Sequence, residues 1–292
     1  VVTNIDTDHM ATYGGDFGQL TDTFLKFLHN LPFYGLAVLC SDDSVIRDLR
    51  PHIRRPVVTY GVEPQADYQA TDIRQHGTRM QFAVSLTDGS AIEVDLALPG
   101  LHNVRNALAA IAVADKVGIS PDSIVKGLRN FAGIGRRFEI LGEIRFDSGR
   151  ALLVDDYAHH PREIEATLAA AQGSWPDRRK VVVFQPHRFT RTEELLDDFS
   201  ALLDGVACLV ITEVYAAGEK PIARADGRAL CRSIRARGGV DPVFVSDLTA
   251  LKETLSPMLR DGDVVLTLGA GDIGRAAREL IAPVRLHEGT YG

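Results

Sequence analysis

The sequence predicts an α/β protein of two domains, and three observations lead to this prediction. From Phe138 onward, short apolar segments alternate with helical ones, which is typical of a mostly parallel sheet covered by helices. Before that point, two segments of alternating apolar and polar residues flank Thr87-Asp88-Gly89-Ser90, which predicts a hairpin. Between these regions, Gly133-Ile134-Gly135 indicates a hinge. We therefore expect domains over residues 1–136 and 137–292.

The first domain is expected to mix strands and helices. Apolar residues at helical spacing, a proline suited to a first helical turn and strand-like runs give the elements. The expected strands are 1–4, 36–40, 57–60, 79–86 and 91–98. The expected helices are 17–31, a short one ending at residue 49, 101–117 and 121–131.

The second domain is expected to alternate strand and helix throughout. Its expected strands are 151–154, 180–184, 207–212, 242–245 and 263–268, and its helices include 161–171, 195–203 and 228–237. In open α/β sheets of this kind, ligands bind beyond the carboxyl ends of the strands. We therefore looked for chemistry-bearing residues directly after each strand.

Composition excludes several classes of protein. The 292 residues are 45% apolar and 24% charged, as in a globular protein. A net charge of -7 argues against a nucleic-acid binder, and the absence of a long apolar run argues against a membrane span. Three cysteines without a C-x-x-C pair favour the reducing cytoplasm. The chain begins Val1-Val2-Thr3 without Met or signal peptide, so we expect a portion upstream.

The segment Asp155-Asp156-Tyr157-Ala158-His159-His160-Pro161 follows one strand and opens a helix. Pro161 suits the first helical turn, so His159 and His160 lie near the positive end of that helix, where anions bind. Asp156 can orient a histidine or deprotonate an attacking amine. The alternative is that the two histidines only cap the helix.

The segment Gln185-Pro186-His187-Arg188-Phe189-Thr190-Arg191 follows another strand, which we expect to neighbour the first. Thr190 and Glu193 have the spacing of a capping box. Arg188 and Arg191, at i and i+3, can point the same way and bind a carboxylate or phosphate through forked hydrogen bonds. A solvated basic surface is the alternative, but cations are unfavourable at a helix start, which favours a bound anion.

Four further groups of residues have weaker patterns. His9, in Asp6-Thr7-Asp8-His9, can help hold a divalent cation, although a structural role is equally compatible. Asn103 and Asn106 can pair with an adenine edge, or Asn103 can cap its helix. Arg136-Arg137 can reach a phosphate or form an ordinary salt bridge. Gly269-Ala270-Gly271-Asp272-Ile273-Gly274 matches a dinucleotide-binding turn, but no acidic residue closes the unit, so a tight strand-to-helix turn is favoured.

Together these segments resemble the Mur ligases. The matching stretches are Thr3-Asn4-Ile5-Asp6-Thr7-Asp8-His9-Met10, Phe27-Leu28-His29-Asn30-Leu31-Pro32-Phe33-Tyr34-Gly35, Gly100-Leu101-His102-Asn103-Val104-Arg105-Asn106-Ala107, Gly135-Arg136-Arg137-Phe138 and both histidine segments. The adjacent histidines and Gln185-Pro186-His187-Arg188 are similar to the members that add L-alanine to UDP-N-acetylmuramate. The resemblance implies the later part of a central ATPase domain followed by a Rossmann-like C-terminal domain.

The resemblance also implies the chemistry. In the family, ATP phosphorylates the muramyl carboxylate and the amine of the amino acid attacks the acyl phosphate, with Mg²⁺ present. The chain contains no G-x-x-x-x-G-K-[ST] loop, which lies upstream in the family, so we expect the isolated chain to be inactive. The expected partners are UDP-N-acetylmuramate and L-alanine, without nucleic acid or membrane, and the resemblance allows a homodimer.

The resemblance assigns a role to each candidate residue. It implies that His9 helps hold Mg²⁺, that Asn103 and Asn106 lie near adenine, and that Arg137 reaches the γ-phosphate. The remaining candidates are Asp156 near the nucleotide, Tyr157, His159, His160 and His187 near the reacting carboxyl and amine, and Arg188 and Arg191 on the alanine carboxylate. The runner-up hypotheses are a nicotinamide-dependent dehydrogenase using residues 269–274 and a ligand-binding module without turnover.

Overall fold

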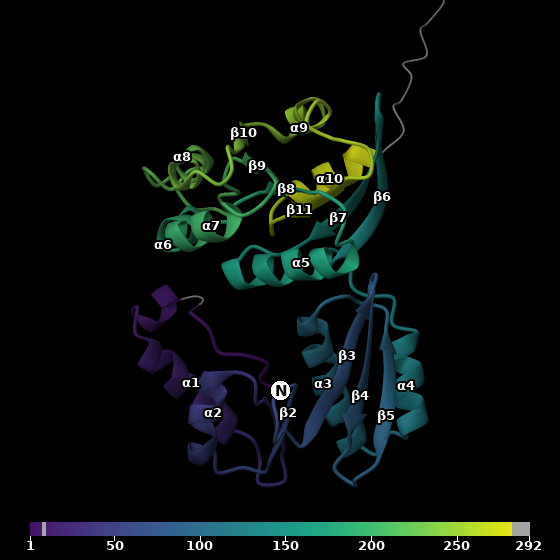
Figure 1. Cartoon of the computed structure of the whole chain (residues 1–292). Coiled ribbons are helices and arrows are strands. Elements are labelled where there is room, and N and C mark those ends of the chain that lie inside the picture. Colours follow the sequence, from purple (N-terminus) through teal and green to yellow (C-terminus); the bar gives the residue numbers. More distant parts are fainter. Residues whose placement is uncertain (8–9, 282–292) are drawn as a thin grey trace, which may run out of the picture. The chain divides into compact units, whose positions relative to one another are not determined.

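The computed structural model describes residues 1–7 and 10–281 and confirms the predicted α/β class (Figure 1). The chain divides into two compact units, Val1–Ala132 and a second that begins at Gly133. Arg136, predicted to end the first domain, therefore falls in the second unit. No helix in the described ranges is long and apolar enough to cross a membrane.

The first unit is built on a five-stranded mixed sheet. Its strands, in spatial order, are β1 (Ala37–Cys40), β2 (Val57–Gly61), β3 (Tyr68–His76), β4 (Arg79–Ser85) and β5 (Ala91–Leu96). β1, β2 and β3 are parallel, and β3, β4 and β5 are antiparallel, which confirms the predicted hairpin. β3 was not predicted. The strand expected over residues 1–4 is reduced to a bridge between Val2 and Leu39.

The helices of the first unit agree closely with the expected ones. They are η1 (Met10–Tyr13), α1 (Phe17–His29), α2 (Ser44–Leu49), η2 (Arg50–His52), α3 (Leu101–Lys116) and α4 (Pro121–Arg129). The buried faces of α1, α3 and α4 share one core with the sheet, because their apolar residues recur at helical spacing.

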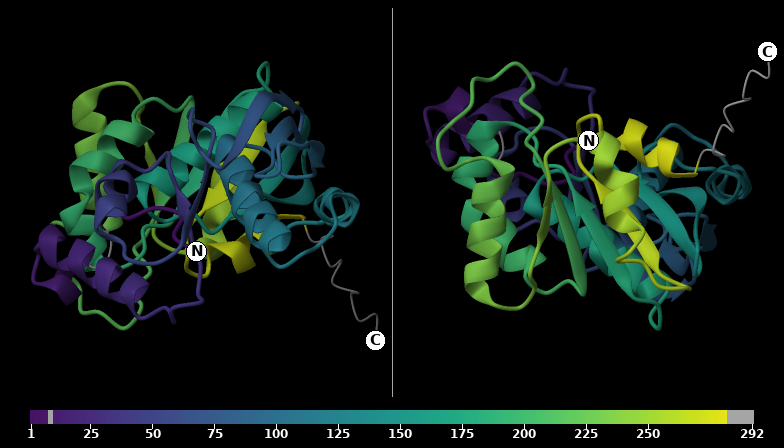
Figure 2. Two further views of the ribbon diagram at one scale, coloured as in Figure 1. Left: turned by 90° about the horizontal axis from the view of Figure 1, so that it is seen from below. Right: turned by 90° about the horizontal axis from the view of Figure 1, so that it is seen from above.

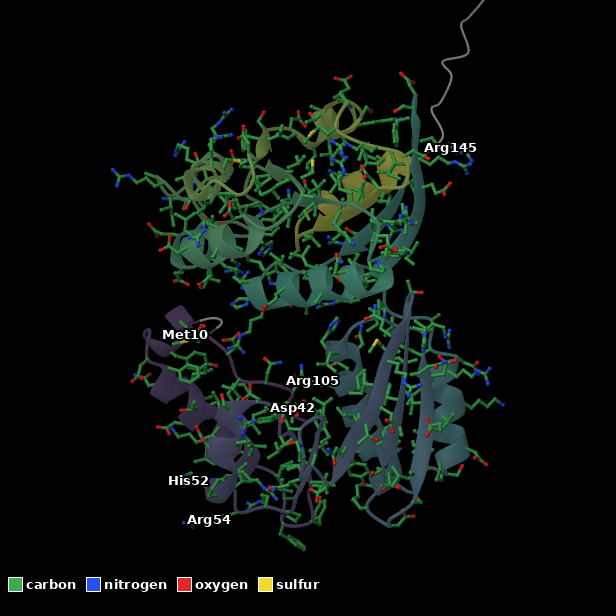
Figure 3. All side chains as sticks on the ribbon, in the orientation of Figure 1. Met10, Asp42, His52, Arg54, Arg105 and Arg145 are labelled. Atoms are coloured by element: carbon green, nitrogen blue, oxygen red, sulfur yellow. The ribbon has the colours of Figure 1, made fainter. Side chains whose placement is uncertain are left out.

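A partly buried ion pair joins α3 to the end of β1. Arg105 Nε donates to Asp42 Oδ2 at 2.6 Å, and Figure 3 shows the two labelled side chains facing each other. The N–H groups of Val62 and Glu63 donate to the same carboxylate. Burial alone would raise the pKa of Asp42, but Arg105 and the two N–H groups outweigh it and lower that pKa.

The second unit is built on a six-stranded sheet. Its strands, in spatial order, are β10 (Val243–Val245), β9 (Cys208–Thr212), β8 (Lys180–Phe184), β11 (Val264–Leu268), β7 (Gly149–Asp156) and β6 (Glu139–Phe146). All neighbours are parallel except β6 and β7. The expectation that the two histidine loops follow neighbouring strands is wrong, because β11 lies between β7 and β8.

Helices cover both faces of this sheet. They are α5 (Pro161–Ser174), α6 (Phe189–Glu194), α7 (Leu196–Leu203), α8 (Gly227–Arg237), η3 (Leu248–Ala250), α9 (Leu251–Leu255) and α10 (Ile273–Ile281). Figure 2 shows helices on both faces of this sheet. Val182 and Phe184 of β8 pack with α5, α7 and α8, whereas Val181 and Val183 pack with α9 and α10. This alternation is why β8 is apolar at every position from Val181 to Phe184.

The parallel strands β7, β8, β9 and β11 all end at the same edge of the second sheet. The loops that leave this edge hold residues 157–160, 185–188, 213–226 and 269–272. Open α/β sheets bind ligands at this edge.

Candidate functional site

Three loops of the second unit bring aromatic and imidazole rings together. The His159 and His187 ring centroids lie 5.5 Å apart at an interplanar angle of 66°. The His187 ring also stacks on Tyr215, from the loop after β9, at 5.5 Å and 12°. A backbone bridge between His187 and Tyr215 fixes this stack. The two predicted histidine loops therefore meet despite the strand between them.

His159 is held through its Nδ1 atom. This nitrogen lies 3.0 Å from the carbonyl oxygen of Tyr157 and 3.1 Å from Glu163 Oε2. The Glu163 carboxylate also accepts the backbone N–H groups of His159 and His160. Burial alone would raise the pKa of Glu163, but the bonds from His159 and the charge of Arg137 lower it to about 2. Glu163 is therefore ionised.

Asp156 holds the backbone at the start of its loop. Its carboxylate accepts the N–H of Ala158 and the N–H of Phe138, both at 2.8 Å. Burial raises the pKa of Asp156 against the effect of these two bonds. The carboxylate that lies beside the His159 ring is Glu163. That Asp156 orients a histidine or deprotonates an attacking amine stays a prediction.

His187 lies beside cations. Arg191 Nη1 is 3.4 Å from His187 Nδ1. Burial first, then the charges of His159, Arg191 and Arg188, lower the pKa of His187 to about 4, with Glu219 acting in the opposite direction. The imidazole of His187 is consequently neutral at physiological pH.

The two arginines of this loop have different partners. Arg188 is the residue before α6, has a φ of 70°, and places Nη1 3.6 Å from Glu219 Oε1. Arg191 is buried and lies against His187. A positive φ at a non-glycine residue is costly and is often found at functional sites.

The start of α6 is held by Glu219 rather than by the predicted capping box. The N–H and the hydroxyl of Thr190 both donate to the Glu219 carboxylate, at 3.1 and 2.7 Å. Thr190 lies inside α6, so the pairing of Thr190 with Glu193 is wrong. Glu219 thus fixes both Thr190 and Arg188 from the loop after β9.

Tyr157 lies beneath two guanidinium groups. The Cζ atoms of Arg136 and Arg137 lie 5.0 and 5.4 Å from the Tyr157 ring centroid. Arg137 is 51% exposed, and its nearest carboxylate is Glu163 at 3.7 Å. Of this arginine pair, Arg137 is the one whose charge faces solvent and can meet a phosphate.

Arg136 fills the glycine-rich turn. Its guanidinium donates to the fully buried Asp155 at 2.9 Å and to the carbonyl oxygens of Gly269 and Gly271. A Cβ atom at Gly274 would overlap the same guanidinium. Gly274 is therefore a glycine because the protein's own arginine occupies the adjacent space, whereas a Cβ atom at Gly269 or Gly271 would meet Gln185.

The other side of the turn is occupied by Gln185. Its Oε1 atom accepts the N–H of Ile273 at 3.0 Å, and its Nε2 atom donates to Asp272. The pyrophosphate of a dinucleotide needs free N–H groups at the start of the helix that follows such a turn. The contacts of Gln185 and Arg136 therefore favour the tight-turn interpretation over a nicotinamide site.

In the first unit, Asn103 and Asn106 lie one helical turn apart in α3. Asn103 Nδ2 donates to the carbonyl oxygen of Pro99 at 2.8 Å, while Gly100, not Asn103, is the N-cap. Asn106 is exposed. The amide of Asn106 and the Oδ1 atom of Asn103 fit the acceptor and donor pattern of an adenine edge.

The predicted magnesium site stays a prediction. His9, the predicted ligand, lies outside them. Among residues 1–7 and 10–281, no group of three or more His, Cys, Asp or Glu side chains can hold a metal ion.

Sequence reasoning missed three residues that shape the cluster: Glu163, Tyr215 and Glu219. Arg136 was named, and it forms the salt bridge that was given as its alternative. Glu163 had a signal, since it follows His160 by the three residues of a capping box. Glu219 lies 29 residues from Thr190, and nothing in the local sequence links them.

Comparison with known proteins identifies the class of protein. Residues 1–114 match the Mur ligase middle domain, and residues 136–271 match the "Mur ligase, glutamate ligase domain". The chain therefore belongs to the Mur ligase family.

Solved structures of several ligases are similar to this chain. UDP-N-acetylmuramate–alanine ligase (MurC) from Thermotoga maritima is 29% identical, with a TM-score of 0.71, over 96% of this chain and 58% of that one. The murein peptide ligase from Psychrobacter arcticus is 25% identical, with a TM-score of 0.62, over 89% and 53%. MurF ligase from Thermotoga maritima, in complex with ADP, shares the fold at 19% identity and a TM-score of 0.67, over 96% and 61%. The chain thus spans less than two thirds of these relatives.

Proposed function

We propose that the chain is part of an ATP-dependent ligase that joins L-alanine to UDP-N-acetylmuramate through an acyl phosphate, in the cytoplasmic synthesis of peptidoglycan precursors. The observation that carries this proposal is the cluster of His159, His187, Arg188 and Arg191 at the carboxyl edge of the second sheet. The similarity to an alanine ligase supports the choice of amino acid.

The cations and N–H groups of the cluster can stabilise the negative charge that this reaction places on oxygen atoms. Phosphoryl transfer and attack on an acyl phosphate both place negative charge on oxygen atoms, which fixed cations and N–H donors stabilise. Arg188 is 46% exposed, so one side of its fork can bind the alanine carboxylate while the other faces Glu219. We assign Arg191, whose guanidinium lies against His187, to the same carboxylate.

The remaining roles follow from the family. Asn103 and Asn106 would bind adenine, and Arg137 would contact the γ-phosphate. Tyr157, His159, His160 and His187 would surround the reacting groups, with Asp156 holding the backbone of their loop. Mg²⁺ would neutralise phosphate charge when bound. Its proposed ligand His9 lies outside the described residues, and we derive no step through it.

The test measures alanine-dependent phosphate release by the complete gene product that carries this sequence, with ATP and UDP-N-acetylmuramate. Arg188→Ala removes one charged hydrogen bond to the amino acid, so it is expected to lower kcat/KM for alanine about 10- to 100-fold. His160→Ala is expected to lower kcat. Arg235→Ala is the matched control, since Arg235 forms an exposed ion pair with Asp241 at the far end of α8.

The amine that is ligated distinguishes an alanine ligase from a murein peptide ligase. Phosphate release with a tripeptide in place of alanine would favour a murein peptide ligase. Normal turnover by both Arg188→Ala and His160→Ala would overturn the assignment of the two loops.

A further inference from the structure

The two neighbouring imidazoles have opposite partners at the same ring atom. Nδ1 of His159 lies between the Tyr157 carbonyl oxygen and Glu163 Oε2. Both oxygens only accept, since a carbonyl has no proton and Glu163 is ionised. Nδ1 of His159 therefore carries the hydrogen, and Nε2 of the neutral ring carries the lone pair.

At His187 the Nδ1 atom faces a hydrogen-bond donor instead of acceptors. Its Nδ1 atom faces Nη1 of Arg191, and a guanidinium only donates. Nδ1 of His187 therefore carries the lone pair, and Nε2 carries the hydrogen. The ring stays neutral because it is buried beside Arg191, Arg188 and His159.

We propose that Glu163 and His159 form a carboxylate–imidazole pair whose Nε2 atom accepts the proton of the attacking amine, while His187, fixed by Arg191, donates from Nε2 to a negative oxygen of the acyl phosphate. This inference rests on the proposed function. Glu163 is a positioning residue that acts through His159, as a carboxylate does when it fixes the tautomer of a catalytic histidine.

The proton and electron pairs balance in this step. The amine nitrogen forms a bond to the carbonyl carbon, and the bond from that carbon to the phosphate oxygen breaks. Phosphate leaves with the electron pair of the broken bond. The surplus proton of the amine moves to His159 Nε2, and the imidazolium is stabilised by the charge of Glu163.

Asp156 has other partners than the His159 ring. Its two oxygens accept backbone N–H groups, from Ala158 and Phe138. Glu163 instead lies one helical turn from His159, on α5, so a rigid element sets the distance between them. Arg137, 3.7 Å from the second oxygen of Glu163, keeps the carboxylate ionised.

The tautomers can be measured on this chain without turnover. Long-range proton–nitrogen NMR spectra of the ¹⁵N-histidine-labelled chain at pH 8 are expected to show the Nδ1–H form for His159 and the Nε2–H form for His187. Glu163→Gln is expected to give a mixture of forms at His159 only. Glu165→Gln, exposed on the same helix, is the matched control and leaves the spectrum unchanged. The same tautomer at both rings overturns the inference.

Activity measurements distinguish a failure of the Glu163–His159 pair from a failure of the proposed function. In the complete gene product, Glu163→Gln is expected to lower kcat roughly 10²-fold, the usual size of a proton-transfer contribution, with KM for ATP unchanged. Trp175 fluorescence checks that the variant is folded. If the wild type shows no alanine-dependent phosphate release, the proposed function fails. If the wild type is active and Glu163→Gln turns over within twofold of it, the carboxylate–imidazole pair alone is overturned.

Discussion

The two histidine loops of the second unit are held in place by different means. Residues 157–160 are held by carboxylates of the same chain segment, Asp156 and Glu163, and by a short link through Asp155 to Arg136. Residues 185–191 are held from far away in the sequence, by Tyr215 and Glu219. The comparison shows that the first loop is fixed mainly by contacts near in the sequence, whereas the second depends on a loop that follows a different strand.

The largest loss of stability around the loop of residues 157–160 is expected when Arg136 is replaced. Arg136→Met leaves Asp155, which is 0% exposed, without its ion pair, and the free energy of unfolding is expected to fall by about 3–5 kcal/mol. Urea unfolding followed by Trp175, the only tryptophan, measures the second unit. Arg137→Met is the control and should change stability by less than about 1 kcal/mol, because Arg137 is exposed. Equal losses in both variants would contradict the prediction.

A smaller effect is expected from crowding the same guanidinium. Gly274→Ala places a Cβ atom against Arg136, and overpacking of this kind costs about 1–3 kcal/mol. Thermal unfolding with the same fluorescence signal measures the loss. Gly205→Ala, whose added Cβ meets no atom closer than 4.0 Å, is the control. A stable Gly274→Ala variant would mean that Arg136 has room to move aside.

The second loop is tested by the titration of His187. Its folded pKa of about 4 lies below the ordinary value of 6.5, so the unfolded state binds the proton more readily. The resulting stability is present above about pH 6.5 and is lost as the pH falls towards 4. Arg191→Met removes a cation and is expected to raise the pKa of His187, as measured by NMR titration. Arg235→Met should leave the pKa unchanged, and an unchanged pKa in Arg191→Met would show that Arg191 does not contribute to the shift.

The smallest effect concerns the link between Thr190 and Glu219. Thr190→Val removes the hydroxyl bond at 2.7 Å, and the expected loss is about 0.5–1.5 kcal/mol. Thr190→Ser retains the hydroxyl and should restore stability in the same urea experiment. A loss in both variants would point to packing of the Thr190 methyl group instead.

The sequence predicted most elements of the fold, and the two strands it missed share a physical cause. β3 and β6 both contain register shifts, near Asp72 with a φ of 51° and near Gly142 with a φ of 138°. A bulge interrupts the alternation of apolar and polar residues from which strands are predicted. Strand β8, which has no bulge, was predicted to the residue.

The candidate site was predictable only as far as its contacts are local. His159 and His187 were found because each follows an apolar strand, and Glu163 was recognisable from its capping-box spacing. The contacts of Arg136 with Gly269 and Gly271 span more than 130 residues. Side-chain partners at such separations depend on strand order, which spacing along the chain does not reveal.

The position of β11 has a consequence for how the protein is made. This strand, Val264–Leu268, is the last of the second sheet to leave the ribosome, yet it lies between the strands that precede the two histidine loops. Domains emerging during synthesis fold once their elements are complete. A nascent chain that ends before residue 264 carries every imidazole of the cluster but has no strand to set their spacing. The cluster can therefore assemble only after β11 has been synthesised.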